Sequence, residues 1–320
     1  MVAGMGHLPR MPADAATGAG ITILMATRQG ARHLPDQLAS IAAQTDRDWQ
    51  LWVSDDGSSD ATCAIVGEFA RRHPVRLMRG PQRGAAQNFL SLLTHPDLPP
   101  GPVAFADQDD VWLSGKLARA RSCLARLSPA QPVLYAAASR LVDAGLHPLS
   151  QPRLPRIAPS FGNALVQNLF SGHTMVLNAS AVAIARQAGP LPCLRYHDWW
   201  LYQLVAGAGG HLILDPEIVA LYRQHDANTL GAGRGLRAAL RRAARLASGN
   251  WRATLRAHAL ALRQADGLLT PVARTTLDAF LDGFPARGLA RAAAFRRHGL
   301  IRSTPAAGLI LQICAGFGRV

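Results

Sequence analysis

The sequence predicts an α/β protein, built on a doubly wound, mostly parallel sheet and followed by a basic helical C-terminal region. Three observations support this fold class. Short apolar runs alternate with segments of helical periodicity over roughly the first 230 residues. Two of these runs end in clusters of Asp, which is typical of buried strands with a ligand site beyond their carboxyl ends. From residue 231 onward, Ala, Arg and Leu dominate at helical spacing.

The first half of the chain has the pattern of repeated βαβ units. Strands are expected at residues 21–26, 49–53, 75–78 and 103–106, and helices at 34–44, 60–72, 84–93 and from about 114. Leu34, Leu38 and Ile41 share one face of the first helix, and Asp60 is the expected N-cap of the second. A helix between two consecutive strands allows those strands to run parallel.

The second half is less regular. Further strands are expected at 133–138, 175–178 and 218–222, and helices at 161–170, 179–187 and 197–205. Residues 145–160 contain four prolines and are expected to form a loop. We therefore divide the chain into a disordered tail at 1–19, an α/β domain at 20–230 and an Arg-rich helical region at 231–320, with breaks near Gly249, Pro271 and Pro285.

Composition narrows the class of protein. Hydrophobic residues make up 49% of the 320 residues, enough for a substantial core. The four cysteines are scattered without a C-x-x-C pair, which argues against a disulfide framework or zinc site and fits the cytoplasm. No signal-peptide pattern and no run of eighteen apolar residues is found. The formal net charge is +14, and residues 231–320, with 15 Arg and 3 acidic residues, account for +12 of it.

Asp107, Asp109 and Asp110 follow the apolar run at 103–106. Three carboxylates at one strand end repel each other unless a cation lies between them. Oxygen ligands of this kind suit Mg²⁺ or Mn²⁺ carrying a diphosphate. The alternative is a solvated acidic turn, which an isolated D-x-D-D often forms.

Asp55 and Asp56 form a second acidic strand end, in the stretch Ser54-Asp-Asp-Gly-Ser-Ser-Asp60. Asp, Gly and Ser are turn-forming residues, so the stretch fits an ordinary turn before a helix. The same carboxylates can instead accept hydrogen bonds from a nucleobase or a ribose.

The stretch His197-Asp198-Trp199-Trp200 opens a predicted helix. An Asp in the first turn of a helix is stabilised by the helix dipole, which requires no function. Two Trp beside a His and an Asp also fit a platform for the apolar face of a sugar next to a catalytic base.

In their order and spacing, these motifs resemble family-2 glycosyltransferases of the rhamnosyltransferase-like branch, over roughly residues 20–230. The resemblance rests on residues 21–30, SDDGSSDAT at 54–62, Asn88-Phe89, DQDDVW at 107–112, 172–178, 197–199 and YRQH at 222–225. It implies a GT-A fold that binds a nucleotide-diphospho-sugar. The chain departs from the family pattern after Thr27, where Arg28-Gln29 replaces the usual Tyr-Asn.

The resemblance also implies roles for single residues. The residues expected to contact the donor are Ala26, Thr27, Asp55, Asp56, Asn88, Asp107, Asp110, Gly172 and Arg223. Asp109 is the expected direct metal ligand, assisted by Asp107 and His225. Asp198 is the expected general base, with His197, Trp199 and Trp200 on the acceptor side.

The Arg-rich region allows two interpretations. Leucines and Trp251 repeat at helical spacing with arginines on the flank, which fits either helices packed on the domain or a surface for anionic lipid. We favour lipid and predict a cytoplasmic protein that is peripheral on the inner face of the cell membrane.

The activity predicted from all these features is inverting transfer of a sugar from a dTDP- or UDP-sugar, with rhamnose as one candidate. The acceptor would be a saccharide or a lipid-linked saccharide of a cell-surface polysaccharide. Two alternatives are a metal-dependent phosphohydrolase, which leaves SDDGSSD, HDWW and YRQH unexplained, and a nucleic-acid-binding protein. The basic region lacks the interleaved aromatic residues of a single-strand binder, so no nucleic acid is predicted as a partner.

Overall fold

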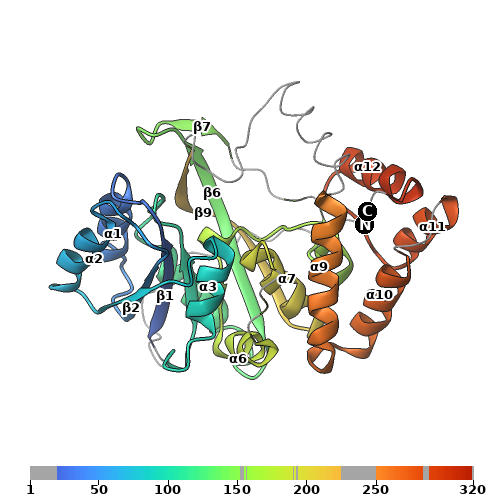
Figure 1. Cartoon of the computed structure of the whole chain (residues 1–320), viewed down its shortest axis with the longest axis horizontal. Helices are drawn as coiled ribbons and strands as arrows, with labels where there is room; N and C mark the ends of the chain where they lie inside the picture. The colour runs from blue at the N-terminus through green and yellow to red at the C-terminus, as the bar shows by residue number, and fades with distance from the viewer. Residues whose placement is uncertain are drawn as a thin grey trace.

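The computed structural model describes residues 20–151, 155, 157–189, 191, 194–224, 250–283 and 288–318. They form one mixed sheet covered by helices on both faces, with further helices at one end (Figure 1). The strand order along the sheet is β3-β2-β1-β4-β8-β6-β9-β5, and β7 pairs with β6. The strands are β1 Ile21–Thr27, β2 Trp49–Asp55, β3 Val75–Arg79, β4 Val103–Ala106, β5 Val111–Trp112, β6 Val133–Val142, β7 Pro148–Ser150, β8 Val176–Leu177 and β9 His211–Arg223.

Strand β1 is the centre of the parallel half of the sheet. It pairs in parallel with β2, where Ile21 lies opposite Trp49, and with β4, where Thr22 lies opposite Val103. Its side chains alternate, so that Ile21 and Ile23 enter one buried cluster while Leu24 enters the other. Burial on both faces explains the continuous apolar runs in the sequence.

The two clusters correspond to the two helical layers. Helices α1 Leu34–Ala42, α2 Thr62–Ala70 and α4 Lys116–Leu124 cover one face of the sheet. Helices α3 Ala85–Leu93, α6 Ala179–Ala188 and α7 His197–Gly207 cover the other. The predicted doubly wound, mostly parallel sheet is therefore confirmed.

The structure corrects several predicted elements. The strand predicted at 218–222 is the end of the longer β9, which pairs in parallel with β6. The register of this pair shifts beside Pro216, because proline has no N–H to donate to the ladder. Strands β5 and β7, of two and three residues, were too short to predict from periodicity.

Two predicted helix boundaries are wrong. The helix predicted at 161–170 is the single turn α5 Phe161–Ala164, after which the side chain of Asn168 accepts a hydrogen bond from the Phe170 N–H. Helix α2 begins at Thr62 with Ala61 as its N-cap. The carboxylate of Asp60 does accept from the Thr62 N–H, but it lies one residue before the cap.

The C-terminal helices are α9 Asn250–Gln264, α10 Pro271–Asp282, α11 Leu289–Arg297 and α12 Pro305–Gly316. Helix α9 packs on α7, with Trp251 stacked on Trp199 at 5.1 Å and His258 Nδ1 at 3.0 Å from Gln203 Oε1. Leu255 and Leu262 are buried in the same core as α7, so this face of α9 serves packing. The tail at 1–19, the boundary at 231 and the amphipathic pattern at 236–247 lie outside the described residues. Within the described ranges, no helix is both long and apolar enough to cross a membrane.

Candidate functional site

The two acidic strand ends meet at one edge of the sheet. Strands β1, β2 and β4 run parallel, so Thr27, Asp55 and Asp107 all lie at their carboxyl ends. The side chain of Gln108 joins these ends, because its Oε1 accepts from the Arg28 N–H at 2.9 Å and its Nε2 donates to the Arg28 carbonyl at 2.9 Å. The DQDD stretch is thereby held against the end of β1.

A possible metal site lies at this edge. Asp107, Asp110 and His173 place ligand atoms within 4.8 Å of one another. His173 comes from η1, a 3₁₀ turn at Gly172–Thr174. Asp110 Oδ2 and His173 Nε2 are buried, and neither has a hydrogen-bond partner among the described residues. Buried polar atoms without a hydrogen-bond partner reduce the stability of a fold, so they call for an explanation. Carboxylate oxygens together with an imidazole nitrogen are a common set of ligands for a divalent cation such as Mn²⁺. The residues present therefore fit the metal.

Lys116 is the basic side chain of this site. Its side chain is fully buried, its Nζ donates to the His173 carbonyl at 2.5 Å, and it lies 3.3 Å from the centre of the Trp112 ring. Burial lowers the pKa of Lys116 well below its usual value, although the charges of Asp110 and Asp107 oppose this shift. The site thus contains one basic side chain close to several carboxyl groups.

The carboxylates are difficult to ionise together. Burial, together with the charges of Asp109 and Asp198, raises the pKa of Asp107 to about 7. Burial also raises the pKa of Asp110 well above its usual value, with Asp107 and Asp109 contributing. An added divalent cation would relieve this repulsion.

The raised pKa of Asp107 predicts pH-dependent metal binding. Below about pH 7 the Asp107 carboxyl is protonated, and a metal must displace this proton to bind. Above about pH 7 the carboxyl is ionised and can bind the metal directly. We expect Mn²⁺ affinity to fall by roughly tenfold for each pH unit below 7. Calorimetric titration from pH 5.5 to 8, in two buffers of different ionisation enthalpy, measures both affinity and proton release. Constant affinity across this range would contradict the prediction.

The structure does not group the metal ligands as the sequence predicted. Asp109, the predicted direct ligand, lies outside the group of Asp107, Asp110 and His173. His225, the other predicted ligand, lies outside the described residues. Asp110, predicted to orient the donor sugar, instead belongs to the group.

Arg223 was predicted to contact a phosphate, and the structure contradicts this. Its side chain is 3% exposed and donates to Asp36 Oδ2, to the Ala144 carbonyl and to the Asp109 carbonyl, at 2.7 to 2.9 Å. All three guanidinium nitrogens are thus occupied by protein oxygens. Arg223 fixes the end of β9 against the DQDD stretch.

Asp55 is held by an extensive set of hydrogen bonds. It accepts from the Thr27 hydroxyl at 2.9 Å, from the Ser58 hydroxyl at 2.6 Å, and from the backbone N–H groups of Gly57 and Ser58. Burial raises the pKa of Asp55, but the hydrogen bonds from Ser58 and Thr27 outweigh it and keep the pKa below its usual value. Asp55 is therefore an ionised, rigid acceptor. It also lines a pocket of about 400 Å³ with Leu77, Arg79 and Gln82.

Asp56 and Asn88 are structural, which corrects their assignment as donor contacts. Asp56 is 4% exposed and accepts from the N–H groups of Gln82 and Gly84, so it fixes the loop before α3. Asn88 is fully buried and donates to the Ser54 carbonyl at 2.8 Å. Both side chains shape the loop around the site without reaching solvent. Ala26 is half-buried at the end of β1, and Thr27 uses its hydroxyl to hold Asp55.

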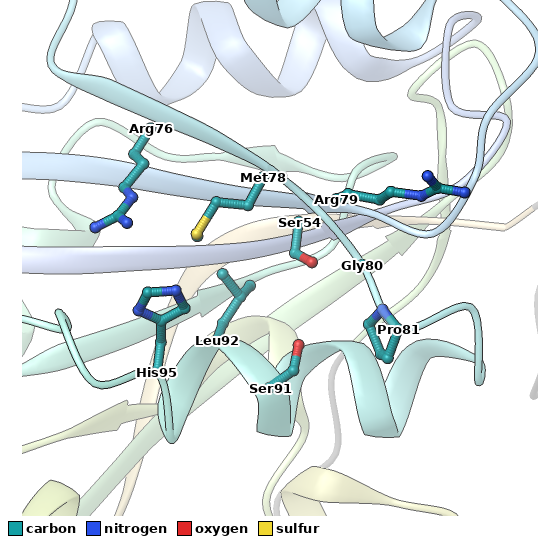
Figure 2. Close-up of a pocket in the computed structure, with 9 residues that line it drawn as sticks. All are labelled: Ser54, Arg76, Met78, Arg79, Gly80, Pro81, Ser91, Leu92 and His95. Atoms are coloured by element: carbon teal, nitrogen blue, oxygen red, sulfur yellow. The ribbon is translucent and has the colours of Figure 1, made fainter.

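A second pocket, of about 320 Å³, lies on the other side of β3 (Figure 2). Figure 2 shows Arg76 and Met78 of β3 pointing toward His95 and Leu92 near the end of α3, whereas the Arg79 side chain extends away from them. Arg76 is paired with Asp97 at 2.7 Å and lies over the Trp52 ring. This pocket contains none of the predicted catalytic or donor-binding side chains.

Asp198 lies across the site from the β4 end. Its Oδ2 accepts from the Gly172 N–H at 3.2 Å and its Oδ1 from the Trp199 N–H at 2.7 Å. The ring of the preceding residue, His197, lies 5.4 Å from the Phe105 ring of β4, which places Asp198 near the β4 end, and the charge of Asp198 raises the pKa of Asp107. A Cβ on Gly172 would lie 2.9 Å from His197 Nε2 and 3.3 Å from Asp198 Cβ, so glycine is needed for this approach. His197 stacks on Phe89 at 4.1 Å, and burial lowers its pKa.

The predicted aromatic platform for a sugar is wrong for Trp199 and Trp200. They are 2% and 1% exposed, and the Trp199 indole N–H donates to the Ala164 carbonyl at 2.7 Å. Trp251 of α9 stacks on the Trp199 ring, a tertiary contact that local sequence cannot show, and Trp200 is buried in the main core cluster. Both residues belong to the core.

This burial makes a prediction about stability. Trp199→Ala should reduce the free energy of unfolding by about 3–5 kcal/mol, because it leaves a cavity between α7 and α9. Urea denaturation measures the change, with Val272→Ala, at a residue that is 77% exposed, as the control. Loss of acceptor binding with unchanged stability would instead restore the platform interpretation.

Comparisons with known proteins identify the family of this chain. The profile of the family described as glycosyl transferase family 2 matches residues 22–142. The dTDP-rhamnosyl transferase RfbG of Shigella flexneri is 30% identical over 229 residues, which are 68% of this chain and 77% of that protein. The chain belongs to glycosyltransferase family 2. This membership replaces the two alternatives weighed from sequence, a phosphohydrolase and a nucleic-acid-binding protein.

Comparison with solved structures gives the fold. The family-2 chain matches residues 1–349 of S. aureus TarS, in complex with UDP-GlcNAc, with a TM-score of 0.61 and 13% identity over 94% of this chain and 87% of that one. It matches the mannosyltransferase PcManGT from Pyrobaculum calidifontis, solved with GDP-Man and Mn²⁺, with a TM-score of 0.51 and 19% identity over 96% and 90% of the two chains. The fold is therefore GT-A.

Sequence reasoning missed two members of this family-2 site. Lys116 opens α4 six residues after Asp110, and a lysine followed by apolar residues at helical spacing normally faces solvent. His173 was considered only as part of the loop after Gly172. The sequence offers one signal for both residues. Each lies close to the end of a short strand, and these strands belong to the same sheet.

Proposed function

We propose that this family-2 glycosyltransferase transfers a sugar, with inversion, from a nucleotide-diphospho-sugar to a saccharide acceptor. The observation that supports it best is the buried group of Asp107, Asp110 and His173, with its two orphaned ligand atoms and Asp198 as a neighbour. We propose dTDP-rhamnose as the donor, because the relative from Shigella flexneri is a dTDP-rhamnosyl transferase. A UDP-sugar is the second candidate, since the TarS structure contains UDP-GlcNAc.

In the proposed reaction the acceptor oxygen bonds to the anomeric carbon as the bond from that carbon to the diphosphate breaks. The acceptor proton passes to Asp198, and the nucleoside diphosphate leaves with the bonding electrons. Asp107, Asp110 and His173 would hold Mg²⁺ or Mn²⁺, which supplies positive charge for the departing diphosphate. Asp55 would accept a hydrogen bond from the base or ribose, because its oxygens are fixed and ionised. Gly172 and Asp198 would together position the acceptor side.

We also propose that the protein works in the cytoplasm as a peripheral protein of the inner membrane face, on a saccharide or lipid-linked saccharide of cell-surface polysaccharide. The support is the net charge of +12 over residues 231–320. Each basic residue near an anionic leaflet contributes about 1 kcal/mol to binding.

A donor panel tests the proposed activity. Thermal unfolding of the full chain would be followed with dTDP-rhamnose, UDP-GlcNAc, UDP-Glc and GDP-Man, each with and without Mn²⁺. A ligand that binds only the folded state raises Tm, and at 100 times Kd it adds about 2.7 kcal/mol. We expect the largest rise for dTDP-rhamnose and only with metal. If no nucleotide-sugar raises Tm, the proposal is contradicted. If only UDP-sugars raise Tm, the donor is a UDP-sugar and not dTDP-rhamnose.

A further inference from the structure

Helix α12 is apolar on two opposite sides, and only one of them is covered. Leu311 and Ala315 are buried in the core shared with α11. On the other side, four large apolar residues are 63%, 47%, 50% and 74% exposed in the described part of the chain: Leu309, Ile310, Ile313 and Phe317. At about 100° per residue they lie within one arc of roughly 100°. We call these four residues the α12 face.

Such a face needs a partner. Single exposed apolar side chains are normal on a protein surface, but a contiguous group on one helix marks an interaction surface. In Figure 1, α11 and α12 lie at the end of the molecule opposite α1 and α2, so the α12 face is on its periphery. Helix α12 is fixed there, because the Gly288 N–H donates to the Gly316 carbonyl at 2.8 Å.

The surrounding charge identifies the kind of partner. After Asp282 the sequence contains six Arg and no acidic residue. Arg296 and Arg297 are exposed in the last turn of α11, which packs against α12. An apolar helix face with arginines nearby is the pattern of helices that lie in the interface of an anionic bilayer. A second copy of the chain would place two cationic surfaces against each other, which the charge disfavours.

We propose that the α12 face inserts into the interface of an anionic lipid bilayer, with the arginines of α11 near the headgroups. This inference rests on, and refines, the peripheral membrane association proposed above. It assigns the attachment to a short helix instead of the Arg-rich region as a whole. Helix α9 does not offer such a face, because Leu255 and Leu262 are buried in the core with α7 and Leu260, at 39%, is the one exposed leucine of this helix.

Vesicle flotation of the full-length protein without donor tests this assignment. The vesicles are phosphatidylcholine alone or with 30% phosphatidylglycerol. We compare the wild type, Leu309→Gln/Ile313→Gln in the α12 face, and Leu149→Gln/Val272→Gln, which changes two exposed apolar residues elsewhere. We expect the wild type and this control to bind anionic vesicles, and the α12 variant to bind them roughly tenfold more weakly. Arg296→Glu/Arg297→Glu should abolish the preference for anionic over neutral vesicles.

Several outcomes would overturn the proposal. Unchanged vesicle binding by the α12 variant would leave membrane association intact and place it on another surface. No vesicle binding by the wild type would contradict both the proposed membrane association and its assignment to the α12 face. A large drop in the Tm of the α12 variant would show that the chain itself covers this face, and a wild-type dimer that becomes a monomer in this variant would identify a second copy as the partner. None of these results changes donor binding measured without lipid, which tests the proposed transfer separately.

Discussion

Asp198→Asn should reduce turnover by roughly 10²-fold or more while leaving donor and metal binding nearly unchanged. A single displacement needs a base on the acceptor side of the sugar, opposite the leaving diphosphate. Asp198 opens α7, is half-buried, and is a neighbour of Asp107 across the site. Its two carboxylate oxygens accept separately, one from the Gly172 N–H and the other from the Trp199 N–H, and an Asn side chain, which has a single acceptor oxygen, keeps one of these two hydrogen bonds. The substitution therefore removes the proton acceptor and one local hydrogen bond, and a thermal unfolding curve of the variant checks that the fold is retained.

The measurement pairs initial transfer rate with donor affinity by calorimetry in Mn²⁺. A variant that turns over normally, or that loses donor binding as strongly as turnover, would show that Asp198 is not the base. Asp110 would then be the next candidate. Asp215 does not qualify, because it is paired with Arg119 at 2.5 Å and accepts from the Tyr135 hydroxyl at 2.9 Å.

Asp107→Asn should weaken Mn²⁺-dependent donor binding by at least roughly tenfold and reduce turnover with it. Asp107 belongs to both ligand sets, the one predicted from sequence and the group that the structure assembles. Its replacement removes a negative charge that would face the cation and leaves Lys116 less well balanced. Calorimetric titration of the donor with and without Mn²⁺ measures the loss.

Asp109→Asn and Asp110→Asn are the matched comparison, because each removes one charge from the same stretch. The structure predicts the larger loss of metal affinity for Asp110→Asn, since Asp110 Oδ2 is buried and orphaned within the group. A larger loss for Asp109→Asn would return the ligand role to the residue predicted from sequence. Unchanged metal affinity in all three variants would contradict a metal site at this strand end.

The parts of the fold that follow local periodicity were predictable. The strands predicted at 21–26, 49–53, 75–78 and 103–106 are all present, because each is a short run of mostly apolar residues, and β4 matches its predicted bounds. The longer pair β6 and β9 was not recognised, because Asp215-Pro216 interrupts the apolar pattern where the register shifts. Local sequence also could not show that α9 covers Trp199, since the contact of that ring with Trp251 joins residues about fifty positions apart.

Some residues of the candidate site were also predictable from local sequence, and others were not. Asp55 and Asp107 were found because carboxylates directly follow apolar strands, and parallel strands bring such ends together. Arg223 and Asn88 were misassigned because each is buried and donates to a partner, Asp36 or Ser54, that is distant in sequence. Lys116 and His173 were missed for the converse reason: only the folded chain places an ammonium group and an imidazole beside Asp107 and Asp110.

Phosphorus-31 NMR of the products formed from a nucleotide-sugar tests the central claim most directly. The full chain would be incubated with dTDP-rhamnose, Mn²⁺ and a membrane extract as acceptor. Transfer at the anomeric carbon predicts dTDP as the phosphorus product at a rate that Asp198→Asn reduces by roughly 10²-fold. Release of dTMP, sugar 1-phosphate or inorganic phosphate would mean that a bond to phosphorus is cleaved instead, and would contradict the account.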